Sequence, residues 1–194
     1  MTALATFDRH GHWLSTSVCE RAACPLAASL GVRWGKWSDG LDDSHPDAQA
    51  QHQHALTQVR QLIGPHVSER LRFSHTAAND ATRPLPHELE GEGAVAHVVL
   101  HGTVLLCVRT GEGFTGLLCE AGDWVLLPAG VPHVFDAGTA PDVELLRLSA
   151  GTRGWFPWET GTPLPPALPA LEAFVEQLLQ ELGEDIDEGE SASA

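Results

Sequence analysis

The sequence predicts a mainly β protein, folded as an antiparallel barrel or jelly roll. From residue 95 onward, short apolar runs recur at regular spacing, and glycine-containing turns separate them. Short strands with this spacing and these turns are typical of such folds. The predicted strands lie at residues 95–100, 103–109, 114–119, 124–127, 131–135 and 143–148.

The rest of the chain predicts elements that flank the barrel. Apolar residues recur at helical spacing in 47–63, and Gly64 and Pro65 end that run. A late amphipathic helix is predicted at 167–182, where Gly183 ends it. Further predicted elements are strand-like stretches at 1–18, 32–37 and 67–73 and a helix at 19–30.

The length of 194 residues indicates one domain, or one domain with an appendage. We expect a barrel domain with N-terminal strand and helix elements at 1–165 and a C-terminal helix at 166–183. The run from Glu181 to Glu190 is strongly acidic. Residues 184–194 are therefore predicted to be an acidic, disordered tail.

Charge and composition exclude several classes of function. The net charge is −15, with 11 Lys and Arg against 26 Asp and Glu, so little is available to neutralise nucleic-acid phosphates. The chain has neither an apolar run long enough to span a membrane nor a signal-peptide pattern. Its four cysteines show no CxxC spacing, so we expect a protein of the reducing cytoplasm. From the charge and the missing apolar run we expect it to bind neither nucleic acid nor membranes. We expect a monomer or dimer.

One stretch, GDWVLLPAGVPHVFD at residues 122–136, carries the clearest functional signal. It predicts a strand, a tight turn at Pro128 to Gly130, and a second strand that begins near His133. A rigid corner of this kind suits a metal ligand or a catalytic imidazole. The alternative is a histidine in a surface loop.

The same stretch matches the second cupin motif, G-x5-P-x-G-x2-H, at Gly122, Pro128, Gly130 and His133. The surrounding sequence, LLCEAGDWVLLPAGVPHVFDAG followed by ELLRL and GWFPWETG, resembles the acireductone dioxygenase family over residues 1–165. This resemblance implies a cupin-type double-stranded β-helix, or jelly-roll barrel, with flanking helices.

The resemblance also implies a function. In that family a single Fe(II) or Ni(II) ion is held by three histidines and one glutamate, and it acts with O2 on an enediol-type small molecule. The iron form belongs to methionine salvage, and the nickel form releases carbon monoxide. His133 matches the last histidine of the family's ligand set.

The first cupin motif of the family, H-x-H-x3-E, is disrupted in this sequence. Its glutamate lies seven residues before a glycine, so counting back from Gly102 places Val95 at the glutamate. The same count places Gly91 at the second histidine and Leu89 at the first. None of these residues can bind a metal ion through its side chain.

Other residues are candidates for a rebuilt site. A slip of one or two positions puts His87 at the first histidine and leaves Glu88, Glu90 and Glu92 as possible carboxylates, although no slip restores the whole set. In a strand, His97 shares one face with Val95 and would point into the barrel. There it can bind a metal ion or act as an acid or base near neutral pH, or it is a core histidine bonded to a neighbour.

Two interpretations therefore compete. In the first, His133, His87 and His97, with Glu92 or Glu90, hold Fe(II) or Ni(II) in a divergent dioxygenase that acts on a small molecule and O2, with His97 as the catalytic residue. In the second, no metal is bound, and the barrel is a small-molecule binding module or an isomerase-like protein.

Overall fold

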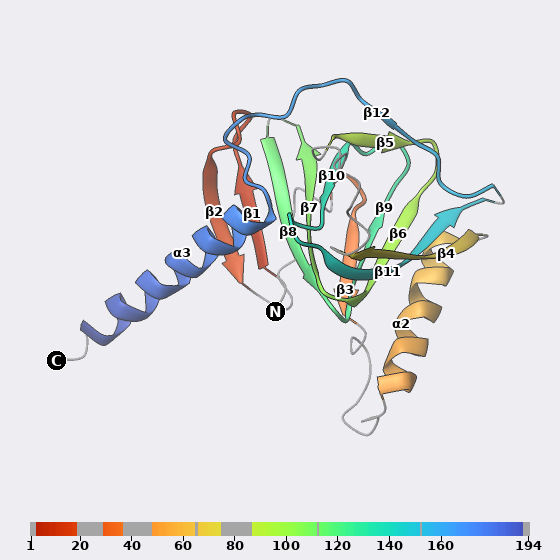
Figure 1. Cartoon of the computed structure of the whole chain (residues 1–194), viewed down its shortest axis with the longest axis horizontal. Helices are drawn as coiled ribbons and strands as arrows, with labels where there is room; N and C mark the ends of the chain where they lie inside the picture. Colours follow the sequence, from red (N-terminus) through yellow and green to blue (C-terminus); the bar gives the residue numbers. More distant parts are fainter. Residues whose placement is uncertain are drawn as a thin grey trace.

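In the computed structural model, two antiparallel sheets face each other around a buried core, which confirms the predicted mainly β jelly-roll architecture (Figure 1). The structure describes residues 3–18, 29–36, 48–64, 66–74, 87–111, 113–151 and 153–191. Among these residues, the larger sheet has the strand order β12 (Pro157–Glu159), β5 (Leu89–Gly91), β10 (His133–Asp136), β7 (Thr103–Thr110), β8 (Gly113–Glu120), β1 (Ala3–Phe7) and β2 (Trp13–Val18). The smaller sheet has the order β3 (Arg33–Lys36), β9 (Asp123–Leu127), β6 (Val95–His101), β11 (Asp142–Ala150) and β4 (His66–Ser74).

Alternation along the strands divides the apolar residues between three cores. On β6, Val95 and Val99 pack between the two sheets, whereas Ala96 and Val98 pack on the outer face. Successive side chains of a strand point to opposite faces, so one strand supplies two cores. The inward-facing core is where any site inside the barrel must lie.

Each sheet has a helix against its outer face. Helix α2 (Ala48–Ile63) packs through Leu56 and Val59 on the smaller sheet, and its bounds nearly match the predicted 47–63. Helix α3 (Leu171–Ser191) packs through Phe174 and Leu178 on the larger sheet, beside β1 and β8. In Figure 1 the far end of α3 extends away from the sheets. No helix in the described part of the chain is long and apolar enough to span a membrane.

The C-terminal helix differs from the predicted 167–182. It begins at Leu171, because Pro169 disfavours a helical conformation in the residue before it and lacks a backbone N–H. It continues through Gly183 to Ser191, where the sequence predicted a disordered tail from 184 onward. A helical glycine costs about 1 kcal/mol relative to alanine and does not by itself end a helix. The helix predicted at 19–30 lies almost wholly outside the described residues, which resume at 29.

A segment after β11 crosses the end of the barrel on its way to α3 (Figure 1). We call residues 153–170 the strap. It contains the short strand β12, which pairs with β5 from Pro157 opposite Gly91 to Glu159 opposite Leu89. The Thr160 backbone N–H also donates to the Glu88 carbonyl at 3.0 Å. The sequence did not predict β5 or β12, since strands of three residues are too short to show an alternating pattern.

Phe174 should account for much of the attachment of α3. Its ring is fully buried and lies 4.9 Å from the ring of Trp13 and 6.2 Å from that of Phe7. We expect Phe174→Ala to lower the free energy of unfolding by about 3–5 kcal/mol, measured by urea denaturation. Leu179→Ala, on the same helix but 65% exposed, should change it by less than about 0.5 kcal/mol. Equal effects of the two substitutions would show that α3 is not docked in this way.

Candidate functional site

The corner at residues 128–130 presents His133 to the interior. Gly130 has a φ of 72°, which glycine adopts without strain, and the chain then enters β10. His133 pairs with Val108 of β7 on one side and Leu89 of β5 on the other. Its side chain is 2% exposed, so it is a core residue and not a surface-loop histidine.

Hydrogen bonding defines which nitrogen of His133 is available. Its Nδ1 lies 2.9 Å from the Val131 carbonyl oxygen, which can only accept, so Nδ1 carries the proton. In the neutral ring, Nε2 then holds a lone pair. This atom is buried and has no hydrogen-bond partner among the described residues.

His97 faces the interior, as the strand alternation predicted. It lies on β6 opposite Arg147 of β11 and Val125 of β9, and it is 7% exposed. Neither ring nitrogen has a hydrogen-bond partner in the described ranges, so it is not a core histidine bonded to a neighbour there. It borders a cavity of about 10 Å³, the size of one water, whose other lining residues are Val99, Val104, Leu106, Cys119, Val125 and Phe135.

Burial keeps both imidazoles neutral near pH 7. Burial, together with the nearby His133 and Arg147, lowers the pKa of His97 to about 3. Burial also lowers the pKa of His133, although its bond to Val131 and the charge of Glu88 act in the opposite direction. Each ring therefore offers one donor and one acceptor nitrogen.

Trp155, from the strap, connects the two histidines. Its indole stacks on the His133 ring with centroids 5.7 Å apart and meets the His97 ring edge-on at 6.0 Å. The guanidinium of Arg147 lies over the same indole, 5.3 Å from its centroid. Sequence reasoning missed Trp155 and left out Arg147; the only available signal was that both lie in segments that carry the family resemblance.

The indole also packs directly on Gly91 of β5. A Cβ atom built on Gly91 would lie 2.4 Å from Trp155 Nε1, closer than real Cβ contacts come. Position 91 therefore has no room for a side chain while Trp155 remains in place.

The other predicted site residues lie at the margin. His87 is exposed, and its Nδ1 is 3.9 Å from an oxygen of Glu159, which is also exposed. Glu90 is half-buried on β5, and Glu92 is exposed in the bend that follows it. The structure thus brings His97 and His133 together around Trp155 and leaves His87, Glu90 and Glu92 apart from them.

Glu88 is the buried carboxylate of this region, and its oxygens are already engaged. Arg109 Nε donates to one oxygen at 2.6 Å, and Thr160 Oγ1 donates to the other at 2.7 Å. These contacts compensate for burying a charge that is 4% exposed. They also fasten the strap to the segment before β5.

The donor set does not fit the four-ligand metal centre that the resemblance implies. Within the described ranges, no three or more His, Cys, Asp or Glu side chains gather closely enough to hold an ion. Two imidazoles meet at Trp155, and the positions counted as first and second histidine hold Leu89 and Gly91. We derive no chemical step through a metal ion at this site.

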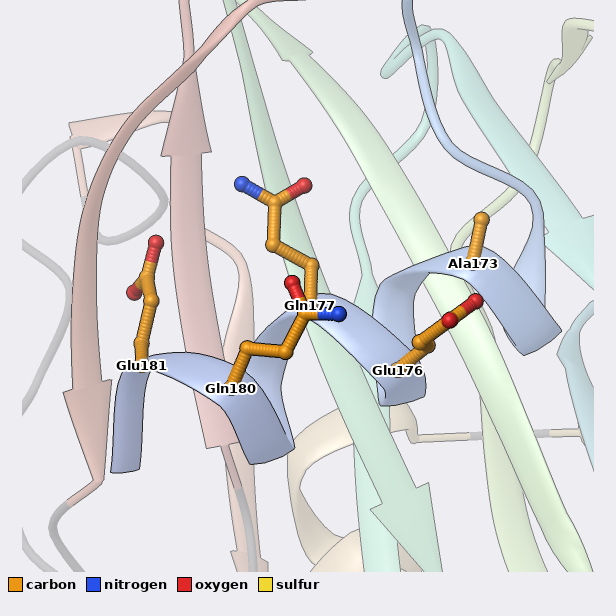
Figure 2. A pocket seen from close by; sticks show the side chains of 5 residues that line it. All are labelled: Ala173, Glu176, Gln177, Gln180 and Glu181. Carbon is orange, nitrogen blue, oxygen red and sulfur yellow. The ribbon is translucent and has the colours of Figure 1, made fainter. Parts of the chain in front are cut away.

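A second hollow, of about 420 Å³, lies along α3 and is unrelated to these residues. Figure 2 shows that it is lined from that helix alone, by Ala173, Glu176, Gln177, Gln180 and Glu181. It contains neither histidine nor cysteine, and it lies outside the barrel core.

Comparisons with known proteins agree with this fold. A family profile described as the ARD/ARD' family matches residues 42–157. An acireductone dioxygenase of Cronobacter sakazakii is 30% identical over 187 residues, which covers 88% of this chain and 99% of the relative. One from another strain of that species is 36% identical over 182 residues, with the same coverage.

A solved structure is similar in fold. The acireductone dioxygenase from Bacillus anthracis, with a cadmium ion in its active centre, superposes with a TM-score of 0.62 at 15% identity. The match covers 81% of this chain and 98% of that one. It confirms the fold class predicted from the sequence.

The lowered pKa of His97 predicts a pH-dependent stability. In the unfolded chain a histidine binds a proton below about pH 6.5, whereas folded His97 stays neutral to about pH 3. Stability is therefore retained above this window and lost as the pH falls through it. Between about pH 7.5 and 5.5, we expect wild type to lose about 1.4 kcal/mol more than His97→Phe, by urea denaturation. His101→Ala, at the exposed end of the same strand, should keep the wild-type dependence; if His97→Phe also keeps it, the assignment is wrong.

Proposed function

This chain belongs to the ARD/ARD' family, and from that premise we propose that it binds an enediol-type small molecule through His97 and His133. The observation that carries the proposal is the set of buried ring nitrogens, Nε2 of His133 and both of His97, without partners among the described residues. Buried polar atoms are costly to leave unpaired, so a cluster of them marks a place where a ligand is expected.

The hydrogen-bonding pattern matches a ligand that carries hydroxyl groups. His133 Nε2 can only accept, so it takes a hydrogen bond from a ligand hydroxyl. His97 supplies one donor and one acceptor, which suits a hydroxyl beside a carbonyl oxygen. An enediol presents this combination on adjacent carbons.

Charged side chains near the site act on a proton shared between the ligand and His133. Burial lowers the pKa of His133, so its ring resists a proton; the charge of Glu88 acts in the opposite direction and would partly stabilise the imidazolium if a hydroxyl proton moved to Nε2. Arg147 lies opposite His97 across the β6–β11 pair, and its positive charge would favour a negative charge on the ligand. Its guanidinium already donates to Glu69 Oε2 at 2.8 and 3.0 Å, so part of that charge is compensated. This role for the histidines needs no metal ion.

Acireductone dioxygenase activity, which the names of the relatives state, is the second candidate, and the family resemblance implies that it depends on a metal ion. Unpartnered imidazole nitrogens are the ligand type that Fe(II) and Ni(II) accept, and this observation favours it. It requires further donors from outside the described residues, because His97 and His133 do not make a complete set.

The remaining expectations accompany this proposal. We place the protein in the reducing cytoplasm, where Cys107 and Cys119 are buried free thiols. Burial raises the pKa of Cys107 to about 12, so it is unreactive. A monomer or dimer remains a prediction.

A binding titration tests the proposal. Protein dialysed against EDTA is titrated anaerobically with reductic acid, a stable cyclic enediol, in a calorimeter. We expect saturable binding at one site, weakened at least about tenfold by His133→Ala and by His97→Ala. His87→Ala, which removes an exposed imidazole, should bind as wild type does.

The same titration separates the two candidates. Absence of saturable binding, or binding unchanged by both interior substitutions, would refute the proposal. Binding that appears only after Fe(II) or Ni(II) is added, with O2 consumption measured by an electrode, would instead establish the dioxygenase.

A further inference from the structure

We infer that the Trp155 indole occupies the ligand position of this site, and that it can do so because residue 91 is a glycine. The inference rests on the proposed site at His97 and His133 and names the residue that determines what that site accepts. In this view Trp155 is a specificity-determining residue, supplied by the strap.

The contacts of the indole place it between the groups that a ligand would use. It stacks on the ring of His133 and lies edge-on to that of His97. It also lies under the guanidinium of Arg147. The space left beside His97 is about 10 Å³, room for one water, so any larger molecule must displace the indole.

Gly91 is explained by this contact and not by its backbone. Its φ is not among the positive values that favour glycine. All three atoms nearest to a Cβ built on it belong to the Trp155 indole, at 2.4, 3.1 and 3.3 Å. A side chain at residue 91 and an indole at residue 155 therefore exclude each other.

Position 91 is also where the family motif places a side chain that binds a metal ion. Leu89 lies directly across from His133 in the β5–β10 pair, and Gly91 shares its face of the strand. Counting back from Gly102 places these two residues at the two histidines of H-x-H-x3-E. The indole thus fills the volume that an imidazole at residue 91 would need.

The strap holds Trp155 inward while its neighbours face solvent. Phe156 is 71% exposed and Trp158 43% exposed. The β12–β5 pairing and the bond from Thr160 to Glu88 fix the strap directly after Trp155. Trp158 therefore provides a matched control, since it is a tryptophan of the same segment outside the site.

A cycle of substitutions tests the inference with Ni2+ as the probe. We would prepare metal-free wild type, Gly91→His, Trp155→Ala and the double variant, and titrate each with NiCl2 in a calorimeter. Gly91→His alone should bind no more tightly than wild type, because the indole leaves the imidazole no room. The double variant should bind at least about tenfold more tightly than either single variant, and adding His133→Ala should abolish that gain.

Two controls keep the result interpretable. Gly91→His with Trp158→Ala should behave as Gly91→His alone. If the Gly91→His variants do not fold, thermal unfolding of Gly91→Ala tests the inference instead. This substitution should lower Tm by at least about 5 °C in the wild-type background and by less than half as much in the Trp155→Ala background. Tight binding by Gly91→His alone, or equal Tm shifts in the two backgrounds, would overturn the inference.

The nickel titrations can fail or succeed independently of the reductic acid titration that tests the proposed function. The nickel cycle reports only which side chains share the space near His133. Failure of reductic acid to bind wild type, with the cycle as expected, would remove the proposed function and leave the role of Trp155 intact. The converse result would remove the inference alone.

Discussion

The end of the barrel depends on the stacking of the Trp155 indole against the His133 imidazole. This stacking needs an imidazole face held at the end of the barrel, a vacant position beside it and a backbone that delivers the indole at the right depth. The corner at residues 128–130 supplies the first, Gly91 supplies the second, and the strap fastened to Glu88 supplies the third. These three conditions come from segments far apart in the chain, which the two sheets bring together. The site is therefore a property of the whole fold and not of one motif.

Much of the fold could be predicted from local sequence, and the reasons are physical. Alternation on β6 correctly placed Val95 and His97 on the inner face, because a strand with one face toward each core must separate its side chains. The turn before His133 could also be predicted, since proline fixes its own φ and glycine adopts the positive φ that Gly130 has. The C-terminal helix was misplaced at both ends, because Pro169 delays its start and Gly183 does not stop it.

The site was less predictable, since its decisive contacts are between residues distant in sequence. Nothing in the local pattern around Trp155 indicates that it faces inward while Phe156 and Trp158 do not. The pairing of β5 with β12 determines this, and three-residue strands leave no periodic signal. Counting positions predicted that Leu89 and Gly91 stand where the family motif has histidines. It could not show what fills the vacated volume, because that requires the strap in three dimensions.

The close contact between residues 91 and 155 has a consequence for how substitutions at the two positions combine. A Cβ on residue 91 would meet the indole in this structure, so the effect of a side chain there depends on what residue 155 is. The two positions, 64 apart in the chain (155 minus 91), therefore form an epistatic pair. Neither position can be assessed from a single substitution alone.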